Sequence, residues 1–73
     1  SILKTNNNAL RIKGLPKDVY QLKVHNVLGK EVKNVSFTAT GVKDISLPKL
    51  VEGVYIVELK SNQLVLNKKI ILE

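Results

Sequence analysis

The chain is predicted to fold as an all-β domain, an immunoglobulin-like or Greek-key β-sandwich of about seven short strands. Two observations support this fold class. Apolar and polar residues alternate along most of the 73 residues, which is the period of a half-buried strand, and no stretch has the helical period. Turn residues interrupt the alternation about every ten residues, as in β-sandwiches. Each element follows from this pattern.

Three strands are predicted in the first part of the chain. Residues 2–4 form the first strand and residues 10–13 the second, which ends at a glycine- and proline-containing turn over residues 14–18. Residues 20–25 alternate again and form a half-exposed strand. The glycine and lysine at residues 29–30 then close a hairpin.

The fourth predicted strand, residues 31–39, changes phase along its length. Val32 and Val35 stand on opposite faces of a regular strand. We therefore expect a bulge or bend near residues 33–34, which would let both side chains point to the core. A turn at residues 40–41 ends this strand.

Three more strands complete the predicted sandwich. Residues 42–47 form a short strand that Pro48 ends, because proline has no backbone N–H to donate. Residues 54–59 are apolar on both faces, which predicts a central strand. A turn at residues 61–63 leads into a final strand over residues 64–72.

The phase of the last two strands predicts which side chains face the core. In the final strand Lys68 has the same phase as its apolar neighbours. These neighbours face inward only if Lys68 extends to solvent or a bulge resets the register. The apolar residues expected inside are Tyr55, Val57, Leu59, Leu64, Leu66, Ile70 and Leu72.

Length limits the possible functions. A chain of 73 residues forms one domain, here residues 1–73, and leaves no room for a cleft walled by a second domain. We therefore expect no enzyme. The apolar fraction of 44% is ordinary for a globular chain, so the domain is expected to fold. It begins with serine rather than methionine, and we interpret it as a piece of a longer protein.

Chemically reactive side chains are sparse. The absence of cysteine removes disulfides, thiolate nucleophiles and sulfur-ligated metals. His25 has no triad partners in the pattern, and a transition metal needs more ligands than one histidine. Oxygen ligands for calcium occur at Asp18, Asp44, Glu52 and residues 6–8, but no ligand-loop spacing joins them, and three successive asparagines fit a turn. We expect no catalytic residue, no metal and no cofactor.

The net charge of +6 raises the possibility of an anionic partner. The basic residues are dispersed, however, and eleven of the twelve are lysine, whereas bidentate recognition of bases and phosphates favours arginine. Only Tyr20, Phe37 and Tyr55 are aromatic, and each lies on an apolar alternation that predicts burial. We expect no nucleic-acid partner and a monomer. No stretch approaches the length of a transmembrane segment.

Four segments in order resemble a known family. They are VHNVLGKEV at residues 24–32, DISLPKL at residues 44–50, GVY at residues 53–55 and KKIILE at residues 68–73. Together they resemble type A C-terminal sorting domains of the type IX (Por) secretion system of Bacteroidetes. The chain departs from the family at residues 6–8, where many members carry Asn-Pro, and in a final turn without glycine.

The resemblance implies a non-catalytic secretion signal attached to an upstream cargo domain. The type IX translocation machinery would recognise this signal in the periplasm, and a sortase-like peptidase would remove it after the cargo crosses the outer membrane, which leaves the cargo at the cell surface or secreted. The residues implied in recognition are Gly53, Tyr55, Lys68, Lys69, Ile70, Ile71, Leu72 and Glu73.

An alternative is a carbohydrate-binding or adhesive β-sandwich module of a secreted enzyme. Such modules usually present a row of aromatic side chains on which sugar rings stack. This chain has three aromatic residues and no tryptophan. The composition therefore favours the sorting domain.

Overall fold

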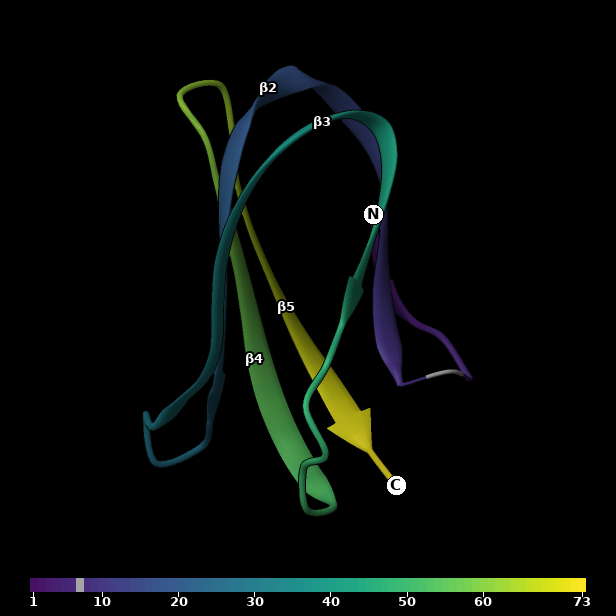
Figure 1. Ribbon diagram of the computed structural model, residues 1–73. Helices are drawn as coiled ribbons and strands as arrows, with labels where there is room; N and C mark the ends of the chain where they lie inside the picture. Colours follow the sequence, from purple (N-terminus) through teal and green to yellow (C-terminus); the bar gives the residue numbers. More distant parts are fainter. Residues whose placement is uncertain (7) are drawn as a thin grey trace.

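The computed structural model describes residues 1–6 and 8–73 of the chain. These residues contain five antiparallel strands. Figure 1 shows them joined in one curled sheet in the order β1-β2-β4-β5, with β3 on the other edge of β2. The all-β prediction is thereby confirmed. The strands are β1 (Ile2–Lys4), β2 (Ala9–Asn26), β3 (Glu31–Ser46), β4 (Gly53–Lys60) and β5 (Val65–Leu72).

The expected count of about seven strands is corrected to five. Residues 10–13 and 20–25 belong to the single strand β2, and residues 31–39 and 42–46 belong to β3. Both predicted turns are bends inside a long hairpin. The register shifts on either side of Leu15, which pairs with Gly41, and such irregularities bend a strand without ending it.

Two glycines make this bend possible. Gly14 has φ +74° and Gly41, across the hairpin, has φ +78°, backbone angles that other residues rarely adopt. The glycines that predicted turns therefore do change the direction of the chain, but they do so inside the paired strands β2 and β3. The turn expected at residues 6–8 includes Asn7, which lies outside the described residues. Its neighbour Asn8 has φ +58°, as is tolerated by asparagine in a turn.

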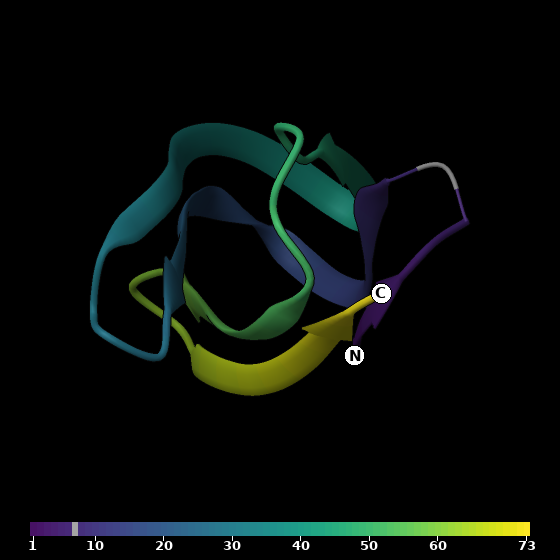
Figure 2. The ribbon, with the colours of Figure 1, turned by 90° about the horizontal axis from the view of Figure 1, so that it is seen from below.

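The bend places the two halves of β2 in facing layers. β1 pairs with residues 10–12 of β2, whereas β4 pairs with residues 21–26. The end-on view of Figure 2 shows the sheet curling around its interior. The link between β3 and β4 passes from one layer to the other. A single sheet thus encloses its core from two sides, as a sandwich does.

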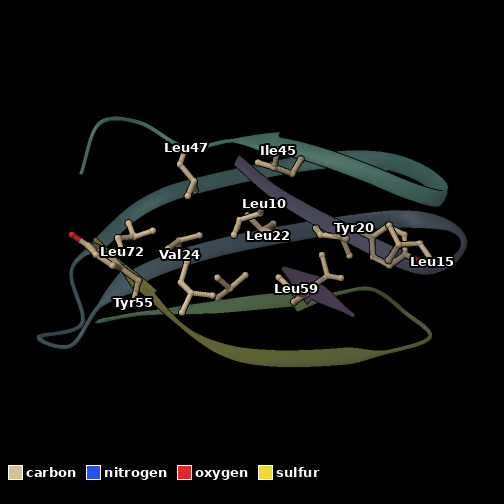
Figure 3. Packing of buried hydrophobic residues seen from close by; sticks show 14 residues of the cluster. Leu10, Leu15, Tyr20, Leu22, Val24, Ile45, Leu47, Tyr55, Leu59 and Leu72 are labelled. Carbon is tan, nitrogen blue, oxygen red and sulfur yellow. The ribbon is translucent and has the colours of Figure 1, made fainter. Parts of the chain in front are cut away.

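Alternating side chains from all five strands, together with Leu47 after β3, form one hydrophobic core between the layers (Figure 3). Tyr55, Val57 and Leu59 face it as predicted. Each large buried aliphatic side chain contributes about 1.5–3 kcal/mol, which is substantial for a small domain. The buried set is Ile2, Leu10, Ile12, Leu15, Tyr20, Leu22, Val24, Ile45, Leu47, Tyr55, Val57, Leu59, Ile70 and Leu72.

The expected bulge in β3 lies beside the predicted position. The register with β2 shifts between Val24, which pairs with Lys33, and His25, which pairs with Glu31. Val32 is therefore the extra residue, directly before residues 33–34. The bulge lets Val32 and Val35 both pack against the core although they differ in phase.

Candidate recognition surface

The terminal hairpin holds all eight residues implied in recognition. β4 and β5 pair without a register shift from Gly53 opposite Leu72 to Lys60 opposite Val65. Ser61 shapes the turn, because its Oγ accepts hydrogen bonds from the backbone N–H of Gln63 (3.1 Å) and Leu64 (3.2 Å). β4 lies between β2 and β5, which confirms the predicted central strand.

β5 is an edge strand. Within the described part of the chain it pairs with β4 alone, so the backbone N–H and C=O groups of its second edge have no strand partner. That edge faces β1 across an opening in the curled sheet. An unpaired edge is able to accept an extended segment from another protein.

Lys68 lies at this opening. The register of β5 is unbroken, so Lys68 shares the inward phase of Ile70 and Leu72, but its side chain is exposed. A shallow cavity of about 160 Å³ is lined by Ser1, Ile2, Leu66, Asn67 and Lys68. Of the two alternatives for this strand, the structure therefore has a solvated Lys68 rather than a bulge.

The inward residues of β5 divide into two groups. Ile70 and Leu72 are each 5% exposed and bind the strand to the core. Leu66, on the far side of Lys68, is exposed at the opening, and Leu64 only packs against the core from a partly buried position. Leu66 lies opposite the buried Leu59 and so keeps the predicted inward phase, but it is 37% exposed because it lines the cavity beside Ser1 and Ile2.

The outward face of β5 presents Lys69 and Ile71. Lys69 lies opposite Ile56, and Ile71 lies opposite Val54 on β4. Ile71 is 59% exposed, whereas Ile56 and Val54 are half-buried. The outer surface of the hairpin is therefore an apolar strip next to a lysine.

Gly53 and Tyr55 lie at the start of β4 rather than on the edge strand β5. Tyr55 is 4% exposed, and its hydroxyl donates a 2.7 Å hydrogen bond to the carbonyl of Val51. Gly53 has φ +151°, so it supplies backbone geometry that a residue with a side chain rarely adopts. These two residues shape the entry into β4.

The eight residues thus form two layers of one hairpin. Those with exposed side chains are Lys68, Lys69, Ile71 and Glu73, and those buried beneath them are Tyr55, Ile70 and Leu72, while the half-buried Gly53 has no side chain. The residues implied in recognition did not include Ile2 and Leu66, which line the opening beside Lys68. The shared phase of Leu66 and Lys68 was the available signal, but the proximity of Ile2 required the fold.

No metal cluster and no membrane-spanning helix occurs among the described residues. These residues contain no group of three His, Cys, Asp or Glu side chains able to hold a metal ion. No helix in that part of the chain is long and apolar enough to cross a membrane. Of the three aromatic rings, Tyr20 and Tyr55 are buried, and Phe37 is half-buried and stacks on Tyr20 with ring centroids 5.7 Å apart. These rings lie in or against the core.

The best-defined ion pair lies away from the hairpin. Arg11 Nε donates to Asp44 Oδ1 at 2.9 Å, and Arg11 Nη2 donates to Oδ2 at 3.0 Å, between β2 and β3. This bidentate pair lowers the pKa of Asp44, chiefly through the hydrogen bonds, and raises the pKa of Arg11. Neither lysine of β5 takes part in this ion pair.

The chain matches a known protein family. A family model described as the secretion system C-terminal sorting domain matches residues 4–73. The matched segment contains the whole of β2, β3, β4 and β5. The comparisons with curated proteins and with solved structures gave no match.

Proposed function

The chain belongs to the family of secretion system C-terminal sorting domains, and we propose that it is a non-catalytic signal that the type IX machinery recognises on a cargo protein. Membership of this family implies a sorting signal of the type IX system and secretion toward the cell surface or the outside. The machinery is the partner that membership implies. The site of contact on the chain is our proposal.

The unpaired edge of β5 is the observation on which the contact site depends. This strand is attached to the core through Ile70 and Leu72, yet it displays Lys68, Lys69 and Ile71 to solvent. A receptor strand added to such an edge gains backbone hydrogen bonds, while alternate side chains supply specificity. The proposed contact comprises these residues and Glu73, with Gly53 and Tyr55 maintaining the hairpin beneath.

The proposed route has three steps. The domain, residues 1–73, remains covalently attached behind its cargo and travels as a folded monomer to the periplasm. The translocation machinery binds it there and carries the cargo across the outer membrane. A sortase-like peptidase then removes the domain, so the cargo is left at the cell surface or is released.

A reporter fusion tests this function. The chain is placed behind a periplasmically exported fluorescent reporter in a Bacteroidetes host with an intact type IX system, and in an otherwise identical host that lacks the translocon. Export by the first host alone is the expected result. If the first host retains the reporter in the periplasm, the sorting function is contradicted and an adhesive or carbohydrate-binding module becomes the better hypothesis.

Deletion of residues 68–73 would also be expected to stop export, but the result would be ambiguous. The deletion removes Ile70 and Leu72 from the core and leaves backbone groups of β4 without partners. Loss of export could then follow from unfolding. Substitution of exposed side chains, as in Lys68→Ala with Lys69→Ala, separates recognition from folding.

A further inference from the structure

The tip of the β2–β3 hairpin exposes two large apolar side chains. Val27 is 70% exposed and Leu28 is 90% exposed, which makes Leu28 the most exposed of the large apolar residues described. Hairpin tips are usually occupied by glycine, asparagine, aspartate or serine, which satisfy turn geometry and contact water. An aliphatic pair at this position contributes nothing to the core and therefore calls for another explanation.

The tip is held rigidly by its backbone and by one side chain. Asn26 Oδ1 accepts hydrogen bonds from the N–H of Leu28 (3.0 Å) and of Lys30 (2.9 Å). The N–H of Asn26 donates to the carbonyl of Lys30, and the N–H of Gly29 donates to the carbonyl of Asn26, both at 2.9 Å. Gly29 has φ +87°. These hydrogen bonds fix the backbone of the tip, and the exposed side chains of Val27 and Leu28 take no part in them.

This tip lies at the same end of the molecule as the end of the proposed recognition strand. Asn26 pairs with Tyr55 on β4, and Gly53 pairs with Leu72 on β5. Figure 1 shows the β2–β3 turn, the start of β4 and the C-terminus at this end. Val51, which is 80% exposed, and Ile71 add apolar surface there. The tip therefore extends the apolar end of the terminal hairpin.

Charge at this end favours a protein over an anionic membrane as the partner. The chain has a net charge of +6, yet the exposed charges that flank the tip and the strand ends balance. They are Glu31, Glu52 and Glu73 against Lys30, Lys49 and Lys69. Binding to anionic lipids requires a cluster of basic residues. A rigid, apolar, nearly neutral projection instead fits a preformed apolar pocket, because little conformational entropy is lost on binding.

We propose that Val27 and Leu28 form an apolar plug that enters an apolar pocket on a protein of the type IX export machinery. The inference rests on the proposed function and adds a second contact to β5. Rigid apolar side chains that fill a pocket are typical of binding hot spots. The plug would orient the domain so that the edge of β5 meets its receptor.

Export of the reporter fusion tests the plug. The double variant Val27→Ser with Leu28→Ser removes the apolar surface, and Val19→Ser with Val42→Ser is the matched control, because those residues are 61% and 56% exposed but lie by the bend. We expect the tip variant to reduce exported reporter at least about tenfold, as loss of a hot spot does. The control pair and the conservative pair Val27→Ile with Leu28→Met should be exported like the wild type.

Folding is measured on the same purified fusions by circular dichroism. Exposed substitutions change stability little, so the thermal midpoint of the domain should be the same in the tip and control variants. Wild-type export together with full export of a folded tip variant overturns the plug and leaves the sorting function intact. Failure of the wild-type fusion to be exported overturns both.

Two further measurements test whether the tip binds lipid or a second copy of the domain instead. Flotation with vesicles of phosphatidylethanolamine and phosphatidylglycerol should leave the wild-type fusion unbound, and flotation that depends on Val27 and Leu28 would assign the tip to lipid instead. Size-exclusion chromatography with light scattering should give a monomer. A dimer that the tip variant loses would assign the surface to a second copy. Either result contradicts the plug.

Discussion

The hydroxyl of Tyr55 donates a hydrogen bond to the backbone carbonyl of Val51, four residues upstream. Tyr20 makes the same contact with the carbonyl of Pro16. In Figure 3 the two rings lie at opposite ends of the core. Each buried tyrosine therefore fixes the segment that precedes it to the sheet, as the tyrosine corner of other β-sandwiches does. Tyr55, the tyrosine of the GVY segment at residues 53–55, therefore has a structural role that can be tested separately from recognition.

We expect Tyr55→Phe to lower the free energy of unfolding by about 1 kcal/mol, the usual net worth of one hydrogen bond. The ring stays buried, so the fold and export of the reporter should persist. Chemical denaturation of the purified domain measures the stability, and Tyr20→Phe is the matched control. If Tyr55→Phe abolishes export while Tyr20→Phe, at equal stability, does not, the hydroxyl itself is recognised.

Gly53→Ala is expected to destabilise the domain by about 1–3 kcal/mol, because φ of +151° is strained for a residue with a side chain. No heavy atom lies within 4 Å of the added Cβ, so the cost is conformational rather than steric. The thermal midpoint measures it. Val51→Ala, at an exposed position of the same loop, should change stability by no more than about 0.5 kcal/mol. Equal stability of both variants would show that Gly53 is not needed for geometry.

Lys68→Ala with Lys69→Ala should leave the domain folded and retain the reporter in the periplasm. Both side chains are exposed, so their truncation costs little stability, but it removes charge from the edge of β5. The control is Lys13→Ala with Lys17→Ala, two exposed lysines by the bend, which lowers the net charge equally. Export is quantified from reporter fluorescence outside the cells. Equal export of the two folded double variants would exclude the β5 lysines from recognition.

Stability should decrease in acid partly through Asp44. The hydrogen bonds from Arg11 hold the pKa of Asp44 below its ordinary value, which is about 3.9 in an unfolded chain. A carboxylate with a lowered pKa in the folded state stabilises the fold above its unfolded pKa, and this contribution disappears as the pH falls through its folded pKa. Urea unfolding should show the loss below about pH 4, and Asp44→Asn should reduce it. Identical pH profiles for the two proteins would mean that the ion pair contributes nothing, as exposed pairs sometimes do.

Much of the candidate site could be predicted from the sequence. The alternation in residues 54–59 placed Tyr55, Val57 and Leu59 in the core, because a shift of one residue moves a strand side chain to the opposite face. The order of the four family-like segments identified the sorting domain that the family model confirms. The first inference depends on local pattern and the second on the order of segments along the chain, and the chain carries both before it folds.

The tertiary structure decided the remaining features. Residues 14–18 have turn composition, but they stay in β2 because Leu15 pairs with Gly41, a partner that local pattern does not reveal. Lys68 has the phase of a core residue, yet it is solvated because β1 and β5 leave an opening. The sequence alone therefore determined which residues alternate and which family they belong to. Strand count, bends and exposed edges depend on pairing between distant segments, and only the folded chain brings those segments together.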